Sequence, residues 1–205
     1  MRTVTLQSLL LRAWQRVGND ASTIDSVPSG ARTMLVAAAN DAIEQCWTWS
    51  DWPELMREEL RTVQGNSTTG FYIDYVQSGQ TEMGEVFAVL RDNPATHVAP
   101  RQIGYTLLGD SIRFPEDTDL PASVYVRYRT RPTEYSASNL SATVPAVLGK
   151  AVSYMLAAAL LEEDGQMDKA LLMEQKAEVE LISERDKYVF QQGQTQRWTA
   201  RVNQY

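Results

Sequence analysis

The sequence predicts an α+β protein, because helical patterns lie at both ends of the chain and strand patterns lie between them. Apolar residues recur every three or four positions in the terminal parts, which is typical of amphipathic helices. In the middle, short segments alternate polar and apolar residues, which is typical of antiparallel strands. We expect a four-helix bundle over residues 1–53 and 133–192, a small antiparallel β-rich insert over 54–132, and an extended C-terminal arm over 193–205.

Two helices are expected in the N-terminal part. The first covers about residues 5–17, where apolar side chains form one stripe, and Gly18 ends it. The second runs from Pro28 or Ser29 to Trp49. Proline suits a first helical turn, and the following residues are strong helix formers.

Six short segments of the middle region have strand character: residues 59–63, 71–76, 85–90, 105–108, 111–114 and 124–130. The dipeptide Gly109-Asp110 separates two of them and indicates a hairpin. Glycine- and serine-rich turns lie between others. These features predict a small antiparallel sheet or sandwich.

Two further helices are expected near the C-terminus, over residues 144–164 and 166–192, with Gly165 between them. This break predicts an antiparallel helix hairpin. The last helix carries an uneven apolar stripe, formed by Leu171, Met173, Ala177, Leu181, Ile182 and Tyr188. The residues that follow are polar and include no acid.

Composition and charge exclude several classes of protein. The chain has 205 residues, of which 43% are hydrophobic and 22% are charged, which is typical of a folded domain. The net charge of −7 argues against a broad basic face for nucleic acid. No apolar run approaches the roughly 20 residues that span a bilayer, so we expect no membrane partner.

Signatures of catalysis and of metal binding are missing from the sequence. Cys46 and His97 are the only cysteine and the only histidine, so a zinc cluster cannot form from them, and one cysteine fits a reducing compartment. The triplet Glu162-Glu163-Asp164 and the pair Asp117 and Asp119 are the acidic groups worth weighing as metal sites. Side chains of adjacent helical residues point in different directions, so the triplet converges poorly on a metal ion. Asp117 and Asp119 lie in a predicted loop. We expect no catalytic residue, no metal and no cofactor, and hence no enzyme.

The tryptophans divide into two kinds. Trp47, Trp49 and Trp52 lie within six positions and are expected to anchor the core where helix meets sheet, with an interface as the alternative. Met155 is expected to be a further core anchor among the helices. Trp198 lies in the polar C-terminal arm, where an aromatic residue indicates docking onto something else.

The order of elements resembles the head–tail connector, or adaptor, proteins of tailed bacteriophages, including the tubular adaptors of short-tailed phages. Trp47-Thr48-Trp49 closes the second helix before a strand region, as in that family. Tyr105, Gly109, Asp110 and Ile112 are similar to its hairpin "Y-x-x-x-G-D-x-I". Residues 124–129 look like its late strand, and residues 144–157, with Pro145 and a "Y-x-L-A" element, look like the start of its third helix.

This resemblance implies a structural protein of the virion neck, assembled in the host cytoplasm. Family members form a ring, typically of twelve copies, beneath the portal of a DNA-filled capsid. The partners implied are other copies of the chain, the portal protein and a tail or nozzle protein. Genomic DNA would pass through the lumen without sequence-specific binding, and the acidic balance of the chain fits such a channel.

The C-terminal arm is expected to dock on the portal by strand addition. Its proposed docking residues are Arg197, Trp198, Arg201, Val202 and Tyr205. In an extended arm, Trp198 and Val202 share one face, and the two arginines could meet portal acids. Two other readings stay open: an unrelated α+β binding or regulatory protein, and a hydrolase that acts through carboxylates.

Overall fold

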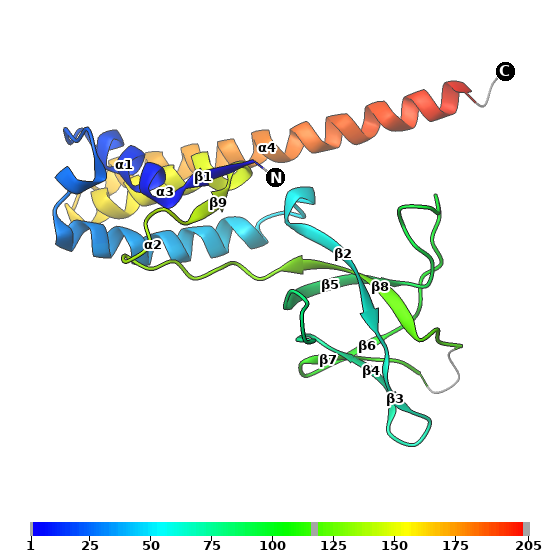
Figure 1. The fold of residues 1–205 in the computed structure, drawn as a ribbon. Helices are drawn as coiled ribbons and strands as arrows, with labels where there is room; N and C mark the ends of the chain where they lie inside the picture. The colour runs from blue at the N-terminus through cyan, green and yellow to red at the C-terminus, as the bar shows by residue number, and fades with distance from the viewer. Residues whose placement is uncertain (1, 116–118, 203–205) are drawn as a thin grey trace. The chain divides into compact units, whose positions relative to one another are not determined.

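The chain is of α+β character and folds into two compact units (Figure 1). The structure is a computed structural model that describes residues 2–115 and 119–202, with side chains as far as residue 188. One unit combines residues up to 54 with those from 132 onward, and the other is formed by Leu55–Arg131. The described residues contain four α-helices and antiparallel sheets.

The first unit holds all four helices and a two-stranded sheet. The helices are α1 (Leu6–Arg16), α2 (Ser29–Thr48), α3 (Ala146–Glu163) and α4 (Met167–Val202). The short strand β1 (Thr3–Thr5) pairs with β9 (Thr143–Pro145), and the 3₁₀ turns are η1 (Ile24–Ser26) and η2 (Pro53–Leu55). The four predicted helices therefore form within about two residues of the expected starts.

Helix α3 is the centre of this unit, because it packs against each of the other three helices. Eleven of its 18 residues are buried, on every side of the helix. A helix that is apolar all round is typical of such an interior position. Small residues allow close approach: a Cβ at Gly149 would lie 3.0 Å from Cγ2 of Val4, on β1.

Helix α1 begins at a side-chain cap. The Thr5 hydroxyl accepts a hydrogen bond from the backbone N–H of Ser8 at 3.3 Å. This contact satisfies one of the free N–H groups of the first turn. The helix buries the side chains of Leu6, Leu9, Leu10 and Ala13, which form the predicted stripe.

A glycine ends α3 and turns the chain into α4. Gly165 has a positive φ of 72°, and its N–H donates to the carbonyl of Glu162 at 2.9 Å. The N–H of Gln166 donates to the carbonyl of Leu161 at 2.7 Å. This pair of hydrogen bonds is the Schellman arrangement, which favours glycine at the turning position.

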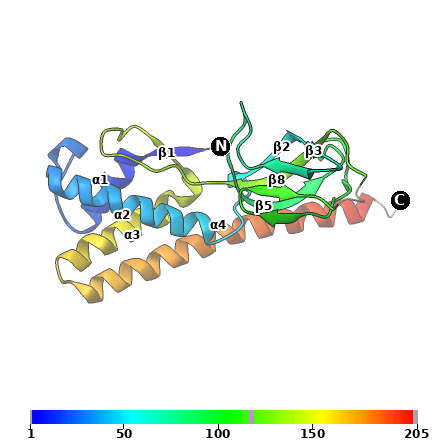
Figure 2. The ribbon, with the colours of Figure 1, turned by 90° about the horizontal axis from the view of Figure 1, so that it is seen from below.

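Helix α4 is longer than the sequence predicts. It contains 36 residues, or about 54 Å at about 1.5 Å per residue, and it runs beyond α1, α2 and α3 (Figures 1 and 2). The expected helix end near Gln192 and the extended arm from 193 are therefore wrong as far as Val202. The segment contains no proline, and one glycine at position 193 costs only about 1 kcal/mol in a helix.

The second unit contains two antiparallel sheets. One has the strand order β2-β8-β5, formed by Met56–Thr62, Ser123–Thr130 and Met83–Leu90. The other has the order β3-β4-β7-β6, formed by Gln64–Asn66, Gly70–Asp74, Ser111–Arg113 and Thr106–Leu108. The strand β3 lies in a segment whose composition predicts only a turn.

Both sheets of the second unit contribute to one apolar core. Its buried members are Ile73, Met83, Val86, Val89, Ile103, Ile112, Phe114, Val124, Val126 and Tyr128. The β5–β8 pairing changes register between Met83 and Val86. A Cβ at Gly84 would lie 2.5 Å from the carbonyl oxygen of Arg129, so the irregular pairing requires glycine there.

Candidate functional site

The three neighbouring tryptophans have different surroundings. Trp47 and Trp52 are buried, and the Trp52 indole N–H donates to the carbonyl of Cys46 at 2.8 Å. Trp49 is 36% exposed, although its ring stacks on that of Trp52 with centroids 6.0 Å apart. The expectation of a core anchor therefore fails for Trp49, which follows the end of α2 and keeps about a third of its surface exposed.

Cys46 is a packed core residue rather than a nucleophile. Its side chain is fully buried, and its Sγ lies 3.4 Å from Sδ of Met155. Burial raises the pKa of the thiol to about 12, so the thiol stays protonated at neutral pH. Met155 itself is half-buried, so it lies at the margin of the core and not in its centre as expected.

Two contacts of polar side chains join the second half of α4 to the end of α2 and to η2. The Tyr188 hydroxyl donates to Oε1 of Glu54 at 2.9 Å. The Arg185 guanidinium lies 5.6 Å from the centroid of the Trp49 ring, within range of a cation–π contact. These contacts position the second half of α4 within its unit.

His97 lies in an exposed loop, where its imidazole contacts a backbone carbonyl and the hydroxyl of the neighbouring threonine. Its Nδ1 lies 3.2 Å from the carbonyl oxygen of Asn93 and 3.0 Å from Oγ1 of Thr96. The same loop is closed by Arg101, which donates from two guanidinium nitrogens to the two carboxylate oxygens of Asp92 at 2.8 and 2.9 Å. These hydrogen bonds lower the pKa of Asp92 well below its usual range.

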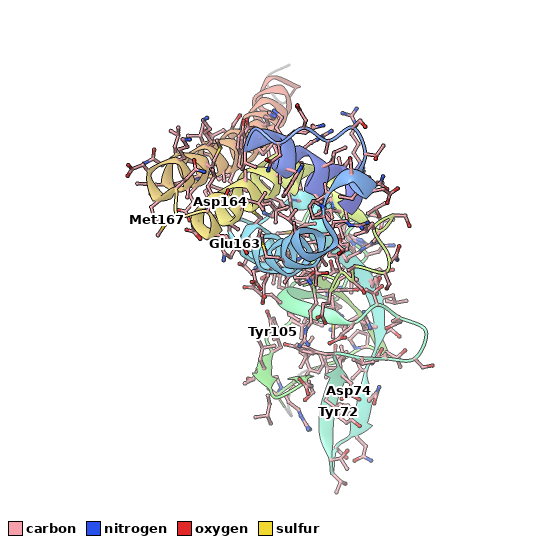
Figure 3. The ribbon with its side chains drawn as sticks, turned by 90° about the vertical axis from the view of Figure 1, so that its left-hand side faces the viewer. Tyr72, Asp74, Tyr105, Glu163, Asp164 and Met167 are labelled. Atoms are coloured by element: carbon pink, nitrogen blue, oxygen red, sulfur yellow. The ribbon has the colours of Figure 1, made fainter. Side chains whose placement is uncertain are left out.

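The acidic residues weighed as metal ligands do not converge. Glu163 and Asp164 are exposed at the turn between α3 and α4, close to Met167 (Figure 3). Asp119 forms an ion pair with Arg91 at 2.8 Å, and Asp117 lies outside the described residues. Within the described residues, no group of three or more His, Cys, Asp or Glu side chains could hold a metal ion.

A buried arginine occupies the second unit. Arg61 has no exposed surface, and its Nη2 donates to Glu59, to the carbonyl of Thr81 and to the Tyr128 hydroxyl. Its Nε and Nη1 have no protein partner, and neither has the buried Oε1 of Gln80. The network ties the strand β2 to the loop before β5, so we assign it a structural role.

A shallow groove of about 410 Å³ lies between α2 and residues 134–137. Asn40 is one of its lining residues: the Asn40 side-chain amide donates to the carbonyl of Tyr135 at 3.0 Å and accepts from the Tyr135 N–H at 2.8 Å. The polar groups of Asn40 are thus already used in holding the returning chain against α2. The groove therefore offers little for the recognition of a ligand.

The side of α4 that faces away from α3 carries exposed apolar residues, with the acidic Asp168 and Asp186 between them. Its buried side, which packs against α3, includes Ala170, Ala177 and Leu181. At about 100° per residue, a second set of apolar residues lies on a different side of the helix. We refer to this set as the outer stripe; its exposed fractions are 63% for Met167, 56% for Leu171, 48% for Leu172, 64% for Val179 and 37% for Ile182.

Two shallow hollows follow the outer stripe and meet at Val179. One has a volume of about 520 Å³ and includes Ile182. The other, of about 360 Å³, includes Leu172 and extends to Tyr154 on α3. Isolated exposed apolar residues are common, whereas several on the exposed side of one helix indicate an interaction surface. We therefore take the outer stripe as the candidate functional site.

The proposed docking residues near the C-terminus stay a prediction. Helix α4 includes the backbone of Arg197, Trp198, Arg201 and Val202. The structure describes side chains only as far as residue 188, so it does not show what these side chains contact. Tyr205 lies outside the described residues.

Comparisons with known proteins add no relative. No known protein family matches the chain, and no curated protein sequence matches it. Among the described residues, no helix combines the length and apolar character that crossing a membrane requires.

Proposed function

We propose that the chain is a structural subunit of a phage virion, a head-to-tail adaptor that forms a ring under the portal. In this proposal the first unit is a four-helix bundle, and Leu55–Arg131 form a β-rich subdomain inserted into it. The ring extends the DNA channel and provides the platform on which the tail attaches. Its place is the neck of the virion, and it assembles in the host cytoplasm.

The observation that carries this proposal is the outer stripe of α4. Five apolar side chains with 37–64% exposure lie along one side of a helix whose other side is already packed. Burial of apolar area is the main favourable term in association, at about 25 cal/mol per Å². A subunit that must pack against further chains is expected to have such a surface.

The order of elements also supports the proposal. Two helices, a β unit and two further helices follow one another along the chain, as in the adaptor proteins that the sequence resembles. The hairpin β6–β7 turns at Gly109-Asp110, the dipeptide on which part of that resemblance rests. The class is inferred from these residues, and its members act through assembly rather than catalysis.

The partners follow from the same proposal: other copies in a ring of about a dozen, the portal protein, and a tail or nozzle protein. DNA passes through the lumen without sequence-specific contacts. The excess of acids over bases, 26 to 19, weakens non-specific attraction to phosphates. Arg197, Trp198, Arg201, Val202 and Tyr205 are proposed to contact the portal, from the C-terminal end of the chain rather than from an extended arm.

The test is binding to purified rings of the portal protein encoded by the same genome. Wild-type chain should cosediment with portal rings and appear as a ring in negative-stain images. A chain truncated after Gln192 should lose binding and keep its melting temperature, because the described packing of α4 lies before that residue. Replacement of Gln192 by alanine in the full chain is the matched control and should bind normally. Absence of portal binding by the wild-type chain would contradict the proposal.

A further inference from the structure

We infer that residues 77–81 cover the outer edge of β2 and keep that strand from pairing with a strand of another chain. We refer to this segment, which belongs to the connection between β4 and β5, as the strap. The inference concerns the second unit alone and does not rest on the proposed adaptor function. It gives the strap a role in preventing association, beside its role in holding the fold.

The outer edge of β2 is defined by the direction of its backbone groups. Strand β2 lies at one end of its sheet, so only one of its two edges pairs with another strand. Just beyond the β2–β8 pairing, the Val63 N–H donates to the carbonyl of Ala122 at 3.0 Å. Because backbone groups alternate in direction along an antiparallel strand, those of Arg61 point to β8, and those of Leu60 and Thr62 point away from it.

Two glutamines of the strap bind these outward carbonyls with their side-chain amides. Nε2 of Gln77 donates to the carbonyl of Thr62 at 2.9 Å. Nε2 of Gln80 donates to the carbonyl of Leu60, also at 2.9 Å. A strand that added to this edge would need the same two carbonyls as acceptors. The strap and an added strand therefore exclude each other.

The turn within the strap matches the repeat of the strand that it covers. The Gln80 N–H donates to the carbonyl of Gln77 at 3.1 Å and closes a β-turn, in which Gly79 has a positive φ of 76°. The first and fourth residues of a β-turn lie within about 7 Å of each other. Alternate residues of an antiparallel strand are also about 7 Å apart, at about 3.4 Å per residue. The two amides are thus spaced to reach alternate carbonyls of one strand edge.

Two further contacts hold the strap in place. The N–H of Met83 donates to the carbonyl of Tyr75 at 3.1 Å and closes the loop at its base. The buried Arg61 guanidinium donates from Nη2 to the carbonyl of Thr81, the last residue of the strap. The strap is therefore fixed at its base, at its end and at both glutamines.

The edge under the strap has the features of an association site. Strand β2 has seven residues, and Leu60 keeps 49% of its surface exposed. Unpaired strand edges with exposed apolar residues are templates for pairing with another chain. The outer edge of β5, at the other end of this sheet, is also covered, because the Ile103 N–H donates to the carbonyl of Val89 at 2.8 Å. A glutamine amide satisfies a carbonyl without presenting a new row of backbone groups, so the sheet ends at the strap.

The experiment removes the two amides and measures association of the full-length chain by sedimentation velocity. Gln77→Ala/Gln80→Ala should assemble beyond the wild-type state at a concentration about tenfold lower than the wild-type chain requires. The measurement is made at a temperature at which circular dichroism shows the variant to be folded. The matched control is Gln102→Ala, an exposed glutamine of the same unit, which should behave as the wild type does. A folded double variant that associates no more than the wild type would overturn the inference.

A third substitution tests whether the added association uses the edge of β2. In the double variant, Leu60→Lys places a charge at this edge, which opposes strand pairing, and should restore wild-type behaviour. Leu108→Lys changes a leucine of β6 that is 63% exposed, in the other sheet, and should leave the association unchanged. Restoration by both lysines, or by neither, would contradict the assignment to β2.

Single variants keep the test decisive if the double variant does not fold. Gln77→Ala and Gln80→Ala each free one carbonyl and keep the other hydrogen bond. Each folded single variant should associate more than the wild type and less than tenfold more than Gln102→Ala, because half of the cover remains. A lower melting temperature without added association in both variants would mean that the glutamines only stabilise the fold, and the inference would be wrong.

Discussion

The Tyr188 hydroxyl of α4 donates a hydrogen bond of 2.9 Å to Oε1 of Glu54 in η2. The two residues are 134 positions apart in the sequence, and the other carboxylate oxygen, Oε2, is buried without a protein partner. The contact therefore joins the second half of α4 to the end of the N-terminal helical segment.

Tyr188→Phe should lower the free energy of unfolding by about 1–2 kcal/mol, because a partly buried carboxylate loses its donor. Chemical denaturation followed by circular dichroism measures the change. The matched control is Tyr72→Phe, since the Tyr72 ring faces Arg113 and its hydroxyl has no described hydrogen bond. Equal stability of the Tyr188→Phe variant and the wild type would show that the hydrogen bond contributes nothing.

The same contact should depend on alkaline pH. Burial, followed by the hydrogen bond to Glu54, raises the pKa of Tyr188 from 10.0 to about 12. A raised folded pKa means that the folded protein binds this proton more tightly than the unfolded chain does. The contribution is complete below about pH 10 and is lost as the pH rises through 12. The stability difference between wild type and Tyr188→Phe should shrink over that interval, and a constant difference would contradict the assignment.

Met155→Asp should destabilise the first unit by about 2–4 kcal/mol, because it places a carboxylate against the buried Cys46 without a partner. Thermal unfolding at low protein concentration measures the effect. The control Met167→Asp changes a residue that is 63% exposed at the start of α4, so it should shift stability by less than about 0.5 kcal/mol. Similar melting temperatures for the two variants would place Met155 outside the core.

Gly84→Ala should destabilise the second unit by about 1–3 kcal/mol, because the new Cβ would lie 2.5 Å from the carbonyl oxygen of Arg129. The matched control is Gly104→Ala, where a Cβ meets nothing within 4 Å. Urea unfolding of both variants provides the comparison. If the two substitutions lower the free energy of unfolding by the same amount, the close backbone approach at Gly84 does not exist in solution.

Cys46 should resist alkylation in the folded protein. Its buried thiol has a pKa of about 12, so the reactive thiolate is scarce at pH 8 and the reagent cannot reach it. Iodoacetamide labelling followed by mass spectrometry should detect modification only after denaturant is added. The variant Ser138→Cys, in an exposed segment, serves as a positive control and should react at once. Rapid labelling of native wild-type protein would disprove the burial.

The helices and most strands could be predicted because their periodic patterns are long enough to show. Leu6, Leu9, Leu10 and Ala13 predict one face of α1, and all of them are buried. The pair β1 and β9 escaped prediction because three residues cannot display a period, and their partners are some 140 positions apart. Helix α4 continues past Gln192, where the polar composition predicts an end, because glutamine and arginine are good helix formers.

The candidate site was visible in the sequence only as an irregularity. The apolar residues of the last helix form an uneven stripe because they belong to two different sides of α4. Ala177 and Leu181 are buried against α3, whereas Leu171 and Ile182 are exposed. Which residues belong to which side depends on where α3 lies, and that is tertiary information. The exposure of Trp49 depends on tertiary information in the same way, because the neighbours of its ring set it and local spacing does not.

The interrupted first unit sets an order of events during synthesis. A ribosome completes Leu55–Arg131 before it has made α3, the helix on which α1 and α2 pack. The β-rich unit is continuous and can fold as soon as it emerges, because its strands pair with one another. The apolar side chains of α1 and α2 cannot pack against α3 until residues 146–163 have been synthesised. During that interval the nascent chain exposes the type of surface that chaperones bind. The first unit can therefore complete its folding only after the last third of the chain has been synthesised.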